Sequence, residues 1–303
     1  MLAANRIMFL ESSPFTLALT FGAILLGLFA GSAAYAIAWR MTHDKPTLGA
    51  SHCPECGHPL TFKQTLPLIS WIVQRGACAY CGKSISLAYP TCELMGAGIF
   101  GSIVFRYGIS VQTVEILALS CVLMVIAMTS LMDYSIRNSC IFWAVGIRVA
   151  YLAYLAFIGE EFLDLAMASV AGVVALGVPL ALAVFLSNAM LARDINGFGT
   201  VKLVAVVGLY LGWQQGMIAI AGAVALGVLV WLVSPIKLVP VEVAGGADEG
   251  PTQMISPRDL KPTFEEDIAE PMRLIPFAPS IVIACWIVLL LGVSLAAWNA
   301  PII

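Results

Sequence analysis

Four cysteines in the first third of the chain have the spacing of a metal site. They form two C-x2-C pairs, Cys53 with Cys56 and Cys78 with Cys81, with twenty-one residues between the pairs and a glycine directly after each. Each pair can present two thiolates from one tight turn, and two such turns complete a tetrahedral sulfur site. Because four sulfur ligands leave no open coordination position, the pattern predicts a structural zinc ion. A redox role and an iron–sulfur cluster are the alternatives, although the spacing is not that of common iron–sulfur proteins.

Asp133 is the second candidate for chemistry. It lies in "TSLMDYSIRNSC", residues 129–140, where a long apolar run ends. A carboxylate at the edge of a membrane is costly to desolvate, which makes it a candidate for function. The alternative is a water-exposed aspartate that only ends a helix.

The composition indicates whether the chain is soluble or embedded in a membrane. Of 303 residues, 60% are hydrophobic and only 11% are charged, and the mean hydropathy is +0.95. Soluble domains have about 25% charged residues. The chain is therefore predicted to be an integral membrane protein, and its small net charge of −3 argues against nucleic acid as a partner.

A membrane-spanning helix needs about 20 mostly apolar residues. On that criterion we predict an all-α polytopic protein with about eight transmembrane helices, at 15–39, 92–107, 111–131, 140–158, 163–190, 200–214, 216–235 and 276–297. The predicted organisation is a first span (1–39), a small zinc-ribbon-like tetracysteine module (40–91), a helical core with the catalytic region (92–235), a polar linker (236–275) and a last span (276–303).

Lysine and arginine predict the orientation. Twelve of the fifteen would lie on one side of the membrane: Arg40, Lys45, Lys63, Arg75, Lys83, Arg137, Arg193, Lys202, Lys237, Arg258, Lys261 and Arg273. Arg6 and Arg106 would lie on the other side, and Arg148 falls within a span. The positive-inside rule places the first group, with the cysteines and Asp133, in the cytoplasm.

Several segments together resemble the type IV prepilin peptidases, which are bifunctional leader peptidases and N-methyltransferases of the GxGD aspartyl membrane protease type. The segments are "GLFAGSAAYAIAWRM" (27–41), the cysteine loop with its flanks (51–93), "GFGTVKLVAVVGLYLGW" (197–213) and "IPFAPSIVIACW" (275–286). The resemblance implies a protein of the bacterial cytoplasmic membrane that faces the cytoplasm with its zinc loop and its active site.

The resemblance implies two catalytic aspartates at the cytoplasmic ends of two spans. Asp133 matches the first, although Ser139 and Cys140 replace an Ile-Pro pair that usually follows. Thr200 occupies the position of the second. A threonine hydroxyl stays protonated at neutral pH and cannot serve as the second carboxylate. We expect Thr200 to act as a helix N-cap instead.

Asp194, six residues before Thr200, is a possible substitute acid, because six residues of loop can span about 20 Å. Three interpretations remain open: a peptidase impaired by Thr200, a divergent enzyme that uses Asp133 with Asp194, and a non-proteolytic paralogue or membrane scaffold. The third would keep pilin binding or methyl transfer.

By resemblance the substrate is a prepilin or pseudopilin with a short basic leader and a hydrophobic helix, and the methyl donor is S-adenosylmethionine. The motif also implies substrate contacts for Gly197, Gly199 and Lys202. Glu93, at the start of the second span, is a further substrate-binding candidate and our first candidate for methyl transfer.

Overall fold

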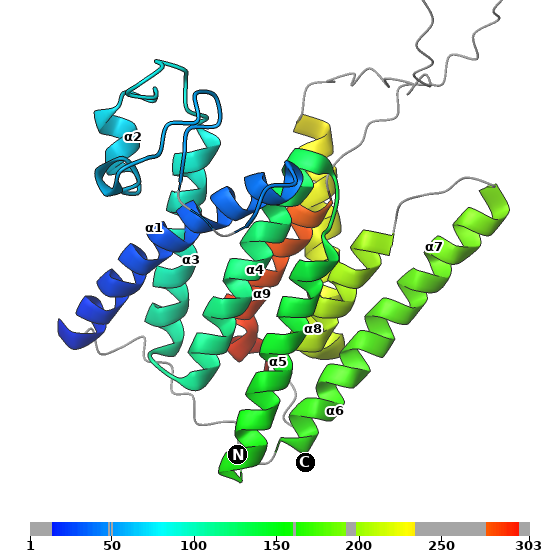
Figure 1. Cartoon of the computed structure of the whole chain (residues 1–303). Coiled ribbons are helices and arrows are strands. Elements are labelled where there is room, and N and C mark those ends of the chain that lie inside the picture. The colour runs from blue at the N-terminus through cyan, green and yellow to red at the C-terminus, as the bar shows by residue number, and fades with distance from the viewer. Residues whose placement is uncertain are drawn as a thin grey trace, which may run out of the picture.

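Helices make up most of the structure. The computed structural model describes residues 14–47, 49, 51–159, 162–191, 198–233 and 277–296. Within these ranges β pairing is limited to two isolated bridges, His52 with Pro59 and Ala77 with Ser84. Both bridges lie in the Cys module, which we define as residues 43–87 between the first two long helices. The predicted all-α class is confirmed (Figure 1).

The helices follow the predicted spans closely. The long ones are α1 (Pro14–Thr42), α3 (Ala88–Tyr107), α4 (Val111–Asp133), α5 (Asn138–Ile158), α6 (Leu163–Gly172), α7 (Val178–Leu191), α8 (Phe198–Val233) and α9 (Ala278–Ala296). A π-helical turn, Val173–Gly177, joins α6 to α7. The Cys module contains a short 3-10 turn, η2 (Phe62–Gln64), and the short helix α2 (Ile69–Val73). In the part of the chain that the structure describes, five helical segments are long and apolar enough to cross a membrane: α1, α4, α5, α6 with α7, and α8.

The segment α8 is a hairpin of two helical arms. Gly212 has φ 69° and ψ −175°, a conformation that is open to glycine and breaks the helix. A Cβ atom on Gly216 would lie 3.8 Å from the Cα atom of Gly208. Eight residues of continuous helix would separate these positions by about 12 Å. The two arms therefore correspond to the sixth and seventh predicted spans, with the reversal at Gly212 rather than near residue 215.

Glycines bring two pairs of helices into backbone contact. A Cβ atom on Gly31 of α1 would collide with the backbone of Cys92 and Glu93 in α3. A Cβ atom on Gly172 of α6 would collide with the backbone of Gly208 in α8. Small residues commonly permit such close packing between helices in a membrane, where dispersion contacts replace the hydrophobic effect.

The bundle is centred on α4. In its apolar segment 67% of the residues are buried, against 17–22% in the other four segments that could span a membrane. Leu119, Leu123 and Ile126 of α4 pack in one cluster with Leu203 of α8 and Val282 of α9. The outer helices α1, α5, α7 and α8 expose large apolar side chains, as lipid-facing helices do.

An ion pair is buried inside this bundle. Arg148 of α5 donates from Nη1 to Oε1 of Glu115 in α4 at 3.0 Å, and from Nε and Nη2 to Oγ of Ser169 in α6 at 3.2 and 3.0 Å. The side chains of Arg148 and Glu115 are only 6% and 4% exposed. The guanidinium carbon lies 5.2 Å from the ring centroid of Tyr210 in α8. The pair therefore joins four helices.

We predict that Arg148→Met destabilises the protein by about 3–5 kcal/mol, because it leaves the Glu115 carboxylate buried without its cation. The double variant Arg148→Met with Glu115→Met should recover most of this loss, since both charges are then gone. The measurement is the free energy of unfolding from dodecyl sulfate titration in mixed micelles, followed by circular dichroism. Val149→Ala is the control, because Val149 is 58% exposed. An Arg148→Met protein as stable as this control would contradict a structural role for the pair.

Candidate functional site

Asp133 is the last residue of α4 and stands at a sharp change of chain direction. Tyr134, the next residue, has the left-handed conformation (φ 49°) and donates its backbone N–H to the Ser130 carbonyl. The chain is extended at Arg137, and α5 begins at Asn138. This short connection leaves the Asp133 side chain 48% exposed at the end of the bundle.

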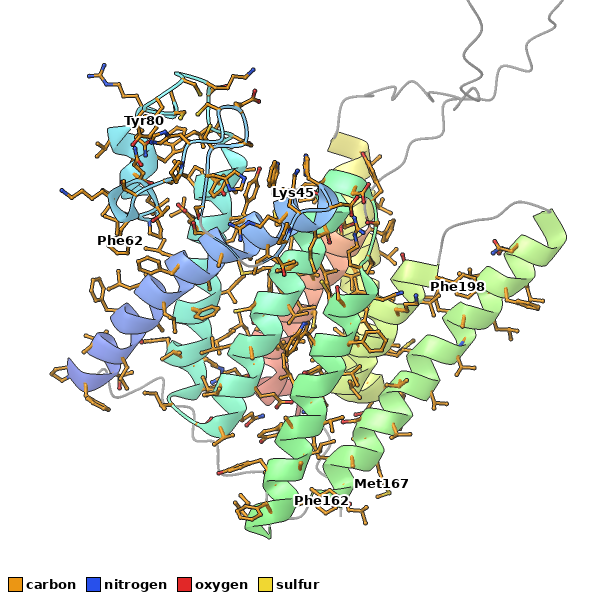
Figure 2. All side chains as sticks on the ribbon, viewed as in Figure 1. Lys45, Phe62, Tyr80, Phe162, Met167 and Phe198 are labelled. Carbon is orange, nitrogen blue, oxygen red and sulfur yellow. The ribbon has the colours of Figure 1, made fainter. Side chains whose placement is uncertain are left out.

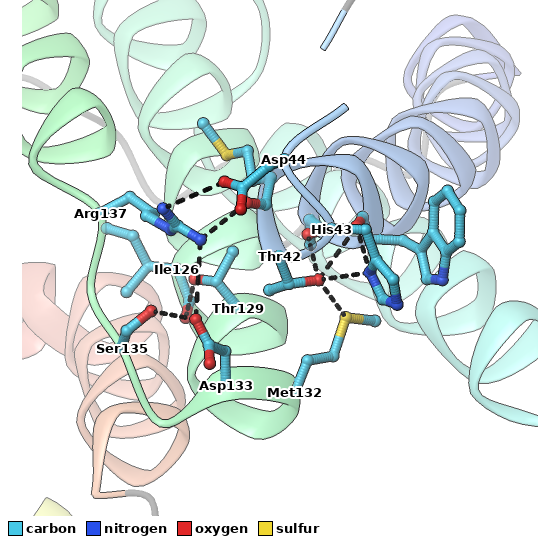
Figure 3. Close-up of polar contacts among 12 residues, drawn as sticks. Thr42, His43, Asp44, Ile126, Thr129, Met132, Asp133, Ser135 and Arg137 are labelled. Atoms are coloured by element: carbon cyan, nitrogen blue, oxygen red, sulfur yellow. Dashed lines mark hydrogen bonds and ion pairs between the residues drawn. The ribbon is translucent and has the colours of Figure 1, made fainter. Parts of the chain in front are cut away.

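Two side chains of the same connection contact the Asp133 carboxylate (Figure 3). Ser135 donates from Oγ to Oδ2 at 2.9 Å, and Arg137 places Nη2 3.6 Å from the same oxygen. The guanidinium also reaches the end of α1, where Nη2 donates to the Met41 carbonyl at 2.8 Å and Nη1 lies 4.0 Å from Oδ1 of Asp44. Arg137 therefore connects Asp133 to the point at which the Cys module begins.

The start of α8 packs against the same connection. A Cβ atom on Gly199 would lie 3.4 Å from Cβ of Ile136, which is ordinary contact. Lys202 donates from Nζ to Oδ1 of Asn138 at 2.8 Å. The structure thus brings the segment that carries Asp133 together with the segment that carries Thr200, Gly199 and Lys202.

Thr200 is half-buried in the first turn of α8. Because the described helix already begins at Phe198, Thr200 lies within the helix and is not the N-cap that we expected. Asp194 and Gly197, the other two candidates from this region, lie outside the described residues.

The four cysteines come together as the spacing predicts. Their sulfur atoms all lie within 4.8 Å of one another, and those of Cys53 and Cys81 are 3.9 Å apart. A tetrahedral zinc ion with bonds of about 2.3 Å would hold its sulfurs about 3.8 Å apart. The residues present therefore fit a zinc ion held by four thiolates.

The two cysteine turns have the same backbone pattern. Gly57 donates its N–H to the Cys53 carbonyl, and Gly82 donates to the Cys78 carbonyl, both at 2.9 Å. Both glycines have positive φ, 69° and 70°, so each turn needs its glycine. Cys53 also donates its own N–H to the His58 carbonyl at 2.9 Å, and Cys78 donates to the Lys83 carbonyl at 2.8 Å. These bonds close each loop.

Backbone amides also prepare one of the thiols for a metal. The N–H groups of Cys81 and Tyr80 lower the pKa of Cys78 to about 7, which favours the thiolate that a metal needs. The Lys83 amide favours the thiolate of Cys81 as well, but burial and the other three cysteines outweigh it and raise the pKa of Cys81 to about 11. Four adjacent thiols titrate as a group in this way, since each thiolate opposes the next ionisation.

Glu93 belongs to a separate site. It is 4% exposed near the start of α3, and its Oε2 accepts the backbone N–H of Leu68 in the Cys module at 2.7 Å. It lines a cavity of about 280 Å³ between the Cys module, α1 and α3. Asp133, Thr200 and Lys202 are not among the residues that line this cavity.

The sequence alone did not indicate the partners of these residues. Ser135 and Arg137 follow Asp133 by two and four residues, and both contact its carboxylate. This local spacing of a hydroxyl and a guanidinium after a carboxylate could have indicated these contacts. The contact between Leu68 and Glu93 joins residues 25 positions apart and has no local signature.

Part of the chain matches a family model. Residues 25–107 match the Bacterial Peptidase A24 N-terminal domain. This range contains the four cysteines and Glu93 and ends before Asp133.

Curated relatives extend the similarity over most of the chain. The prepilin leader peptidase/N-methyltransferase of Bacillus subtilis (strain 168) is 30% identical over 209 residues, which are 68% of this chain and 79% of that protein. The protein of the same name from Stutzerimonas stutzeri is 27% identical over 247 residues, 82% of this chain and 73% of the relative. No solved structure is significantly similar. From this similarity, together with the paired cysteine turns, the chain belongs to the prepilin leader peptidase/N-methyltransferase family.

Proposed function

We propose that this protein acts on prepilins or pseudopilins at the cytoplasmic face of a bacterial cytoplasmic membrane, as a leader peptidase whose cleavage step is impaired by Thr200. The observation that carries the proposal is the contact of two segments, residues 133–138 and the start of α8, through Ile136 with Gly199 and Asn138 with Lys202. An aspartyl protease needs two carboxylates on neighbouring segments, and these are the two segments that the family motif assigns to them.

The reaction explains why one carboxylate is insufficient. One carboxylate removes a proton from water while the water oxygen attacks the scissile carbonyl carbon. The other acid gives a proton to the carbonyl oxygen, and the tetrahedral species then collapses as the amine leaves with a proton. Asp133 can fill one of these roles. The hydroxyl of Thr200 has neither the acidity nor the basicity for the other.

Asp194 is the alternative partner for Asp133, and it defines the divergent-enzyme hypothesis. Catalysis is sensitive to misplacement of about 1 Å, so an acid six residues before the motif position has to be held there by its own contacts.

The substrate proposed is a chain with a basic cytosolic leader followed by a hydrophobic helix in the membrane. A site formed by the C-terminal end of α4 and the N-terminal end of α8 suits cleavage at that junction. Lys202 is engaged with Asn138, which favours a role in holding α8 against α5 over direct contact with substrate. A Cβ atom on Gly199 would make only ordinary contact with Ile136, so this approach does not require the glycine.

A second proposed function is N-methylation of the new pilin N-terminus. The protein would then be a non-proteolytic paralogue, or a methyltransferase that also cleaves weakly. Thr200 favours it, because the protease motif is altered while the cysteine turns and the Glu93 cavity are complete. When bound, S-adenosylmethionine would supply an electrophilic methyl group to the amine, which would lose one proton as the carbon–sulfur bond of the donor breaks and the carbon–nitrogen bond forms. The residues near Glu93 are the candidates to hold it.

Zinc has a structural role in this proposal. Four thiolates would close its coordination shell, so the ion fixes the Cys module over α1 and α3 and takes no part in cleavage.

We predict that Thr200→Asp increases prepilin cleavage by about 10⁴-fold, because loss of one member of a catalytic unit commonly costs that much. The measurement is the initial rate of leader release by the purified full chain in detergent. Thr200→Asn is the matched control, since it has a similar shape without a charge and should not increase the rate. Asp133→Asn should abolish the gain. Equal rates for the unaltered chain and Thr200→Asp would overturn the assignment of Thr200 to the position of the second aspartate. If the unaltered chain cleaves prepilin and Asp194→Asn abolishes that activity, the divergent enzyme that uses Asp194 is favoured.

We also predict one zinc ion per chain, lost when Cys56 or Cys81 is replaced by serine. The removal of one ligand opens the site, and the Cys module should then become sensitive to limited proteolysis while the membrane helices keep their circular dichroism signal. Atomic absorption measures the metal. Cys121→Ser is the control and should retain the ion. A full zinc content in Cys81→Ser would contradict the four-cysteine site.

A further inference from the structure

The Cys module carries an apolar surface that is exposed in the structure. The side chains of Phe62, Ile69, Ile72 and Val73 are 73%, 60%, 67% and 75% exposed, and we call these four residues the apolar patch. Phe62 belongs to η2 and the other three belong to α2, and these two short elements are in contact. Exposed apolar side chains that gather in this way commonly mark a contact with a protein or a membrane.

The spacing within α2 is that of a helical face that is normally buried. Ile69, Ile72 and Val73 occupy positions i, i+3 and i+4, which share one face of a helix. The contact of α2 with the rest of the module is made by a different residue, Trp71, which donates Nε1–H to the Ile85 carbonyl at 3.3 Å. The helix is therefore attached to the module through Trp71 and presents an apolar face outward.

The backbone fixes this short helix at both ends. Leu68, directly before α2, and Arg75, two residues after it, have positive φ values of 59° and 53°, which are uncommon for residues with a side chain. The Leu68 N–H is donated to Oε2 of Glu93 in α3 at 2.7 Å, and the Arg75 N–H to the Ile72 carbonyl at 3.0 Å. These contacts hold α2 with the apolar patch facing outward.

Two cationic side chains flank the apolar patch. Lys63 directly follows Phe62, Arg75 follows Val73 by two positions, and both are exposed. Among the residues that the structure describes, neither Lys63 nor Arg75 forms an ion pair. Both charges are therefore available to an anionic partner.

The two acidic residues of the Cys module are engaged elsewhere. Glu55 places Oε2 3.8 Å from Nζ of Lys83, and Asp44 places Oδ1 4.0 Å from Nη1 of Arg137. The surface around the apolar patch is thus apolar and positively charged, which complements an anionic surface.

The apolar patch lies close to the level at which the lipid-facing surface of the helices begins. The Cys module lies over α1 and α3 (Figure 1). Figure 2 shows Phe62 at the edge of the module near α1, and Tyr80 on the side away from the helices. Phe29 of α1, which lies beneath the module, is 46% exposed, and Leu94 of α3 is 58% exposed. A bilayer that meets these side chains would have its headgroups at the height of the patch.

We propose that the apolar patch enters the headgroup region of an anionic bilayer, with Lys63 and Arg75 beside the lipid phosphates. Apolar side chains at the acyl boundary and cations at the phosphates are the two components of interfacial membrane binding. A bilayer is favoured over a protein partner because the patch continues the lipid-facing surface of α1 and α3 and its flanking charges are both cationic. The inference concerns how the Cys module is held and does not depend on cleavage or methyl transfer.

Photocrosslinking of the zinc-loaded full chain in lipid nanodiscs tests this contact. The photoreactive residue p-benzoylphenylalanine replaces Phe62 or, as the matched control, Tyr80, which is 50% exposed on the other side of the module. The nanodiscs contain phosphatidylcholine mixed with phosphatidylglycerol. Peptide mass spectrometry should find lipid adducts at position 62 in about tenfold higher yield than at position 80, because only the patch reaches the acyl boundary. Equal yields at the two positions, or no lipid adduct at position 62, would overturn the proposal.

The flanking cations give a second test. Lys63→Gln with Arg75→Gln should lower the yield of lipid adduct at position 62 about threefold in the mixed nanodiscs and leave it nearly unchanged in phosphatidylcholine alone, since only the anionic lipid attracts these charges. Lys83→Gln is the matched control, because Lys83 already pairs with Glu55, and it should not lower the yield. The same yield in the double variant and in this control would refute a contact with anionic lipid.

Other occupants of the patch would give other adducts. A crosslink between two copies of the chain, in place of the lipid adduct, would identify an interface of a dimer and overturn the proposal. A crosslink to an added prepilin would identify a substrate contact and overturn it as well. Zinc content and the circular dichroism signal are measured for every protein, so that a loss of crosslinking through misfolding is recognised. The comparison of positions 62 and 80 remains decisive if a charge variant loses its zinc.

Discussion

The contact between the α4–α5 connection and the start of α8 is the constraint on which the proposed proteolysis depends. Lys202 and Asn138, 64 positions apart in sequence, are joined by one hydrogen bond of 2.8 Å, and Gly199 packs against Ile136 beside it. Position 200 lies between these two anchors. Its side chain is therefore carried by a segment whose placement relative to Asp133 is set by packing. In the proposed proteolysis, the identity of residue 200 decides whether a second carboxylate is present.

Arg137 extends this constraint to the other functional region. Its guanidinium contacts Asp133 and, on the opposite side, the Met41 carbonyl and Asp44 at the end of α1. Thr42 reaches Sδ of Met132 at 3.9 Å in the same place. The chain passes directly from there into the Cys module, so a displacement of α1 would move the cation beside Asp133. Arg137 thus links the end of α1, where the Cys module begins, to the region proposed for cleavage.

The features that could be predicted from the sequence are those with a local pattern. Apolar runs indicated the helices, and the two C-x2-C-G segments indicated the sulfur cluster and the tight turns, in which Gly57 and Gly82 have positive φ. The pairing of Glu115 with Arg148 had no such pattern, because it joins two spans whose relative rotation is set by packing. The expectation for Thr200 was wrong for a related reason: cap preferences describe the start of a helix, and the helix here extends at least two residues further toward the N-terminus.

The break at Gly212 has a consequence for the path of the chain through the bundle. A continuous helix of 36 residues would be about 54 Å long, nearly twice the thickness of the hydrocarbon layer, and would cross it once. The reversal instead folds the segment into two arms, and the second arm runs back along the bundle toward the end at which α8 begins (Figure 1). A single backbone conformation therefore decides at which end of the bundle α8 finishes.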